Sequence, residues 1–216
     1  MRLYQAHVSQ FIEDVQLSKI ADILATAYRQ AYKREVSEGE YRSWHYSLRF
    51  MKDSLDIVRL NNCHIVLEHQ MPYTSNRLDV MLFGKDSEEK DSSVVVELKQ
   101  WTEIEPSDID GNILTPIAGG LRECAHPSLQ VGGYIRELED SYHVFEDNPP
   151  LHLSGTVFCH NLDGKSSGAQ ILYAPEHTEL LKDHPVYTKS QIKEFGEYLR
   201  ERLGKGNGTE IFERFD

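Results

Sequence analysis

The chain has 216 residues, 39% of them hydrophobic, which is enough for one domain with a full core. Its net charge of −12 counts against an autonomous nucleic-acid binder, because phosphate contacts need Lys and Arg. The three cysteines do not have zinc-binding spacing. The sequence has no apolar run of membrane-spanning length, and its N-terminus does not resemble a signal peptide. We therefore expect a cytoplasmic protein with no membrane partner.

Two helical patterns open the chain. Residues 18–33 carry apolar side chains at a helical period. We therefore assign residues 1–36 to an N-terminal helical segment packed on the core. Ser37 and Glu40 have the spacing of a capping box, which predicts the start of a second helix, and Asn61 and Asn62 predict its end.

The centre of the chain has the pattern of an α/β domain. Residues 102–122 are rich in Pro and Gly and predict a long irregular loop, and a helix is predicted at about residues 128–141. Apolar runs predict strands at residues 63–71, 77–84, 93–100, 153–161 and 169–174. Together these elements predict an α/β fold with a central mixed β-sheet flanked by helices.

The C-terminal part begins with a second capping box. Thr188 and Gln191 have the required spacing, which predicts a helix after them. Residues 204–208 have the composition of a glycine-rich linker. Residues 204–216 are therefore interpreted as a linker and the start of a possible following domain.

Asp79, Glu97 and Lys99 carry the strongest functional signal in the sequence. Glu97 and Lys99 are two positions apart on a predicted strand, so their side chains share a face and Leu98 points into the core. Asp79 lies on the preceding predicted strand. Two carboxylates at one point repel each other unless a cation lies between them, and oxygen ligands of this kind suit Mg²⁺ or Mn²⁺.

This arrangement resembles the PD-(D/E)xK nuclease superfamily, with Asp79, Glu97 and Lys99 at its signature positions. Gln130 and Tyr134 form a Gln-x-x-x-Tyr motif on the next predicted helix, as in the RecB-like branch of that superfamily. The resemblance extends over roughly residues 37 to 175. It implies a restriction-endonuclease-like fold, which we assign to residues 37–203.

The resemblance also implies roles for the matching residues. Asp79 and Glu97 would bind the metal ion, with the main-chain carbonyl of Leu98 as a further ligand. Lys99 would orient or deprotonate the attacking water and stabilise charge in the transition state. Gln130 would hold the site together or contact the phosphate, and Tyr134 would line the substrate groove.

Family members often add an acid from the helix before the first strand. Glu40 is the candidate, although its place in the capping box is a sufficient structural explanation, and Glu68 on the first strand is the alternative. Arg77 shares a strand face with Asp79 and can pair with it. Arg77 and Arg122 are the candidates for substrate binding, with a solvated charge as the simpler interpretation of Arg122.

The expected function is a metal-dependent nuclease that hydrolyses DNA. The alternatives are a catalytically silent nuclease-like module that binds nucleic acid or a partner protein, an RNA nuclease, and a plain cross-strand salt-bridge face at Asp79, Glu97 and Lys99. The segment from 43 to 48 is similar to the N-terminal regions of bacterial Schlafen-like helicases. That similarity implies a C-terminal helicase or ATPase domain as a partner.

Overall fold

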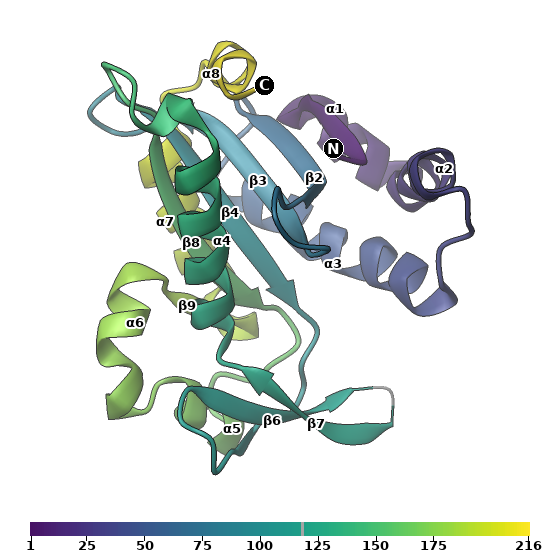
Figure 1. The fold of residues 1–216 in the computed structure, drawn as a ribbon, viewed down its shortest axis with the longest axis vertical. Coiled ribbons are helices and arrows are strands. Elements are labelled where there is room, and N and C mark those ends of the chain that lie inside the picture. The colour runs from purple at the N-terminus through teal and green to yellow at the C-terminus, as the bar shows by residue number, and fades with distance from the viewer. Residues whose placement is uncertain (118) are drawn as a thin grey trace.

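The computed structural model describes residues 1–117 and 119–216 of the chain. It shows the expected α/β architecture, in which a mixed six-stranded sheet has helices on both faces (Figure 1). A small three-stranded sheet lies beyond one end of it. Within the described residues, no helix combines the length and the apolar character needed to cross a membrane.

The six-stranded sheet has the strand order β1-β2-β3-β4-β8-β9. The neighbouring pairs from β1 to β4 are antiparallel, whereas β8 is parallel to β4 and β9 is parallel to β8. Its strands are β1 (Tyr4–His7), β2 (His64–Gln70), β3 (Arg77–Lys85), β4 (Asp91–Lys99), β8 (His152–Cys159) and β9 (Val186–Thr188). The strands predicted at 63–71, 77–84, 93–100 and 153–161 are thus confirmed. Continuous apolar runs such as Val94–Val96 are expected in these strands, because both faces of the sheet are covered and every side chain of the run is buried.

Four helices cover one face of the sheet. They are α1 (Val8–Gln16), α2 (Ile20–Tyr32), α3 (Glu38–Ile57) and α7 (Ile192–Leu203). Ser37 begins α3 as predicted, because its Oγ accepts a hydrogen bond from the amide of Glu40 at 3.2 Å. The helix ends before the predicted Asn61, where Arg59 adopts a positive φ. The N-terminal segment packs on the core but also supplies edge strand β1, which the sequence pattern did not predict.

The opposite face is covered mainly by α4 (Pro127–Ser141) and α8 (Gly208–Phe215). The interpretation of 204–216 as a linker does not describe these residues, because α8 packs on β3 and β2 with Ile211, Phe212 and Phe215 buried. A Cβ added at Gly208 would lie 2.2 Å from the amide nitrogen of His64. Glycine is therefore present here for close packing rather than for flexibility.

Two predictions between the strands were wrong. The expected loop at 102–122 contains β5 (Glu105–Pro106), β6 (Asn112–Ile117) and β7 (Gly120–Ala125), which form the small sheet. Ala118, within that expected loop, lies outside the described residues. These strands are short and mostly exposed, so they lack a clear apolar pattern. The expected strand at 169–174 is instead part of α5 (Ser167–Leu172), which Ser166 caps, and a short apolar run alone cannot separate the two possibilities.

The second capping box was predicted correctly. The amide of Thr188 donates to Gln191 Oε1 at 2.9 Å, and α7 follows directly. Helix α6 (Thr178–Asp183) precedes this capping box and lies beside α4. Together these elements leave the C-terminal end of β4 between α3 and α4.

Candidate active site

The ends of β3 and β4 bring two acids together. The regular ladder between these strands stops at the pair Val80 and Val96, so Asp79 and Glu97 occupy the next positions on the two strands. Asp79 Oδ2 accepts a hydrogen bond from the main-chain amide of Leu98 at 2.8 Å, which extends the contact between the strands by one side chain. The side chain of Leu98 packs into the core, as strand alternation predicts.

Glu97, Lys99 and two side chains of α4 form a hydrogen-bonded cluster. Lys99 Nζ lies 2.7 Å from Glu97 Oε1 and 2.9 Å from Gln130 Oε1. The amide nitrogen of Gln130 donates to Glu97 Oε1 and to the hydroxyl of Tyr134, both at 2.8 Å. Lys99 Nζ also lies 5.1 Å from the centre of the Trp101 ring. The motif residues therefore meet in space although about thirty residues separate Lys99 from Gln130.

Burial and charge shift the pKa values in this cluster. Burial raises the pKa of Asp79 well above its ordinary value, and the nearby charges of Glu97 and Glu68 raise it further. Burial opposes the charged form of Lys99, but the carboxylates of Glu97 and Asp79 outweigh it and raise its pKa overall. Burial also raises the pKa of Tyr134 to about 12. Lys99 therefore stays positively charged at neutral pH.

One oxygen of Glu97 remains without a partner. Glu97 is only 4% exposed, and its Oε2 makes no hydrogen bond with any described residue. A buried oxygen of this kind, together with the Asp79 carboxylate, fits Mg²⁺ or Mn²⁺. The described residues hold no group of three or more His, Cys, Asp or Glu placed to bind a metal. A cation here would complete its shell with main-chain, water or substrate oxygens, as Mg²⁺ commonly does.

Glu68 lies opposite Asp79 on β2. Leu67 pairs with Val80 and His69 with Leu78, so Glu68 and Asp79 lie between these pairs. Glu68 has a positive φ of 54°, which breaks the regular strand and is rare for a residue with a Cβ. Burial, partly opposed by the charge of Arg77, raises the pKa of Glu68 to about 7.

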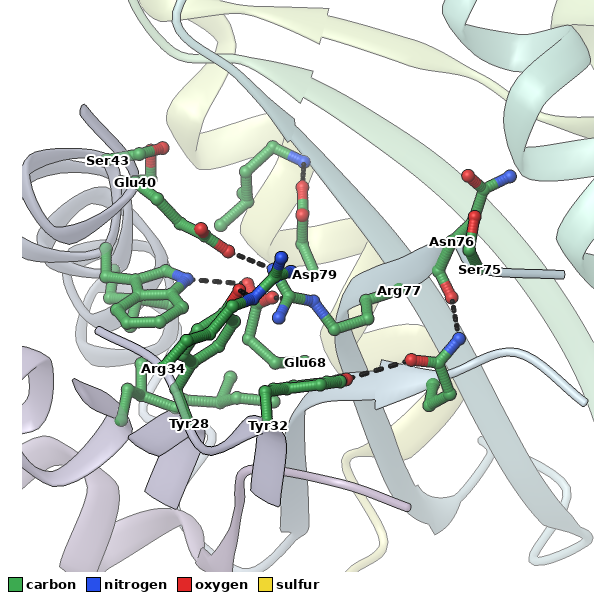
Figure 2. Close-up of a pocket in the computed structure, with 17 residues that line it drawn as sticks. Tyr28, Tyr32, Arg34, Glu40, Ser43, Glu68, Ser75, Asn76, Arg77 and Asp79 are labelled. Atoms are coloured by element: carbon green, nitrogen blue, oxygen red, sulfur yellow. Dashed lines mark hydrogen bonds and ion pairs between the residues drawn. The ribbon is translucent and has the colours of Figure 1, made fainter. Parts of the chain in front are cut away.

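Arg77 joins Glu68 to Glu40 rather than pairing with Asp79. Its Nε lies 3.0 Å from Glu68 Oε2, and its terminal nitrogen forms an ion pair with Glu40. Trp44 Nε1 donates to Glu68 Oε1 at 2.8 Å. The Glu40 side chain therefore does not close the capping box with Ser37. Both candidate acids are placed near Asp79, but each is already engaged by Arg77 (Figure 2).

A cavity of about 570 Å³ opens beside Asp79, between α2, α3, β2 and β3. Tyr28, Tyr32 and Arg34, which Figure 2 labels, line it, and Trp44 also belongs to its lining. Tyr28, Tyr32 and Arg34 were not predicted as site residues from the sequence, because Tyr28 fits the apolar stripe of a helix. The spacing of Tyr28 and Tyr32, one helical turn apart and just before Arg34, was the available signal.

A polar network ties the end of β4 to α3. Gln100 Nε2 donates to the hydroxyls of Ser43 and Ser47, both at 2.9 Å. His160 Nε2 lies 3.0 Å from Ser47 Oγ, and the His160 amide donates to the main-chain carbonyl of Lys99 at 3.1 Å. These contacts fix the backbone at Lys99 and Gln100. Neither Gln100 nor His160 was predicted as a site residue from the sequence.

Arg122 is not brought to the site. It lies exposed on β7, opposite Thr115 in the small sheet, and its side chain makes no hydrogen bond or ion pair with the described residues. Its assignment to substrate binding therefore gains no support from the geometry.

No protein-family model, curated protein or solved structure matches this chain.

Proposed function

We propose that this chain is a metal-dependent nuclease that hydrolyses phosphodiester bonds in DNA. The observation that carries the proposal is the cluster of Glu97, Lys99 and Gln130 beside Asp79, with a buried Glu97 oxygen that has no hydrogen-bond partner in the described part of the chain. The mixed sheet, with antiparallel β2 to β4 followed by parallel β8, is consistent with a restriction-endonuclease-like fold.

Asp79 and Glu97 would hold the cation. When bound, Mg²⁺ or Mn²⁺ lowers the pKa of a coordinated water and polarises the phosphoryl oxygens. Asp79 has a raised pKa, so binding of a cation would displace its proton. Glu97 is buried and its charge raises the pKa of Asp79, so a positive partner is favourable at this site.

Lys99 acts as a fixed positive charge in this proposal. Because its pKa is raised, it keeps its proton and is suited to orient a water and to stabilise charge on the phosphate, rather than to act as the base. Gln130 contacts both Lys99 and Glu97 and so holds their relative orientation. Tyr134 in turn accepts from the Gln130 amide and lines the same region.

A catalytically silent module is the second candidate. Its supporting observation is that Lys99 and Glu97 satisfy each other in a closed hydrogen-bonded cluster, as a structural salt bridge would. An RNA nuclease would use the same chemistry. The further proposal of a helicase or ATPase partner domain rests on the similarity around Trp44 and Ser47, both of which line the cavity beside Asp79.

A cleavage assay separates these functions. Labelled single-stranded and duplex DNA and RNA are incubated in Mg²⁺ or Mn²⁺ with wild type, Lys99→Ala and the control Lys182→Ala, which removes an exposed lysine on α6. Cleavage by wild type and the control, with a loss of about 100-fold or more in Lys99→Ala, would support the nuclease. Equal cleavage by all three proteins would refute the assignment, and binding without cleavage would support the silent module.

A further inference from the structure

The cavity beside Asp79 is not used by the proposed hydrolysis. Its volume of about 570 Å³ lies within the range of small-molecule pockets. Asp79 forms part of its wall and also belongs to the candidate catalytic cluster. Whatever occupies the cavity would therefore lie next to the bond that is cut.

Aromatic rings and guanidinium groups form one wall of the cavity. The rings of Tyr28 and Tyr32 lie 4.6 Å apart between centres, and Trp44 lies 6.2 Å from Tyr28. The guanidinium carbon of Arg77 lies 5.1 Å from the Tyr28 ring centre, and Arg34 Nε donates to the Tyr28 hydroxyl at 2.9 Å. Tyr28 and Trp44 are only 4% and 5% exposed, so Tyr32 and Arg34 are the flat groups of this wall with surface left for stacking on a nucleobase.

The polar groups inside the cavity suit a base with amino donors. Its lining holds three carboxylates, those of Glu40, Glu68 and Asp79, and two guanidinium groups. Arg77 is already paired with both Glu40 and Glu68. The positive charge of Arg77 is therefore taken up within the wall, and Arg77 is not free to hold a phosphate. The carboxylate oxygens suit the amino donors of a base.

The mouth of the cavity keeps free polar groups. Only Nε of Arg34 is bonded within the described residues, and the side chains of Ser75 and Asn76 are exposed and make no hydrogen bond with those residues. Figure 2 shows Arg34 at one side of the cavity and Ser75 and Asn76 at another. These groups are placed to contact the sugar and the edge of a base that enters between them.

We propose that this cavity binds the base of one unpaired nucleotide, so that the site acts on single-stranded ends or unpaired strands. The inference rests on the proposed nuclease function, since it places the phosphate of that nucleotide at Asp79. A paired base cannot enter this cavity without leaving its stack and its partner. Unpaired nucleotides avoid that cost, and they are therefore the preferred substrates.

The binding test uses nucleosides in EDTA, which makes it independent of metal and of cleavage. Calorimetry measures the Kd for deoxyadenosine, deoxycytidine and inorganic phosphate with wild type, Tyr32→Leu, Arg34→Ala and the control Arg29→Ala. Arg29 is an exposed arginine on the same helix as Tyr32. At least one nucleoside is expected to bind, phosphate is not, and Tyr32→Leu or Arg34→Ala should raise the Kd about tenfold or more, with Arg29→Ala unchanged.

A competition test addresses strand preference. Single-stranded oligonucleotides should displace a bound nucleoside, and blunt duplexes of the same sequence should not. The proposal would be overturned if neither nucleoside binds to wild type. It would also be overturned if wild type, Arg34→Ala and Tyr32→Leu bind nucleosides equally well. Cleavage of DNA would then still stand as evidence for the nuclease, whereas nucleoside binding without any cleavage would retain the cavity and refute the nuclease. Thermal melting confirms that each variant is folded, and Arg34→Ala carries the test if Tyr32→Leu is not.

Discussion

Asp79 on β3 accepts the main-chain amide of Leu98 on β4 at 2.8 Å, so one candidate metal ligand is held by the strand that carries the other. This bond uses Oδ2 and continues the contact between the strands beyond their last regular pair, Val80 and Val96. A cation bound between Asp79 and Glu97 would therefore join two strands as well as two charges. Metal binding and folding stability should be coupled in this protein.

The first prediction concerns that coupling. Millimolar Mn²⁺ or Mg²⁺ should raise the melting temperature of wild type but not of Asp79→Ala, because only the native site with both carboxylates binds the ion. At a concentration about 100 times the Kd, the expected stabilisation is about 2.7 kcal/mol. Thermal denaturation with and without the ion measures it. The control Asp53→Ala, which removes an exposed acid on α3, should respond like wild type. Equal shifts in all three proteins would show that the ion acts elsewhere.

The second prediction concerns pH in the absence of metal. The pKa of Glu68 is raised from 4.5 to about 7, mainly by burial. A group with a higher pKa in the folded state stabilises most below its unfolded pKa, and this stability is lost as pH rises through the folded value. The free energy of unfolding should therefore fall between pH 4.5 and about 7. Asp79 shifts in the same direction.

Denaturant unfolding at a series of pH values checks this dependence. Glu68→Gln keeps an acceptor for Trp44 but removes the titrating group, so its stability should change less with pH than that of wild type. Glu13→Gln, at an exposed position on α1, is the matched control and should follow wild type. Parallel curves for wild type and Glu68→Gln would contradict the prediction.

The sequence predicted which residues of the candidate site lie close together better than it predicted their surroundings. Strand alternation and the antiparallel order of two adjacent strands were enough to bring Asp79, Glu97 and Lys99 together, since both features are local. The contact between Arg77 and Glu40 was not predictable, because it depends on how α3 crosses β3. The cavity was missed for the same reason, since α2, α3 and two strands meet there only after the chain has folded.

The small sheet and α8 show a second limit on what can be predicted from the sequence. The strands of the small sheet are short, and only Ile113 and Thr115 of β6 are buried, so the alternation is too brief to predict three strands within residues 105–125. Gly208 has the composition of a linker but lies against the backbone of β2. Composition alone does not separate a glycine that provides flexibility from one that permits close contact.

The third prediction concerns the packing of α8 on the sheet. Phe212 on α8 is 4% exposed and stacks on His64 with ring centres 4.1 Å apart. Phe212→Ala should lower the free energy of unfolding by about 3–5 kcal/mol, because it removes a large buried ring that fixes α8 to the sheet. Glu213→Ala, at the neighbouring exposed position, should change it by less than about 0.5 kcal/mol. Equal stabilities in urea denaturation would mean that α8 contributes little to folding.

The fourth prediction concerns Gln130. Its amide contacts Lys99, Glu97 and Tyr134, so Gln130→Ala should leave Lys99 less firmly oriented without removing a charge. We expect kcat for DNA cleavage to fall about 10- to 100-fold with little change in KM. The metal-induced rise in melting temperature should persist, because both carboxylates remain. Gln30→Ala, on the exposed surface of α2, is the control. Loss of the metal response would instead make Gln130 essential to the metal site.

The last prediction concerns Gln100, which does not touch the cluster itself. Its amide donates to Ser43 and Ser47 on α3, and Lys99 is the residue before it, so the helix restrains the backbone that carries Lys99. Gln100→Leu keeps the size of the side chain but removes both bonds and leaves the two hydroxyls without that donor. Cleavage should slow about tenfold or more through kcat, since small displacements of a charged group reduce its effect in the transition state. Gln16→Leu, exposed at the end of α1, should cleave like wild type. If Gln100→Leu retains full kcat while its melting temperature falls, Gln100 contributes to folding alone. The restraint on Lys99 then comes from the His160 amide, which donates to the Lys99 carbonyl at 3.1 Å.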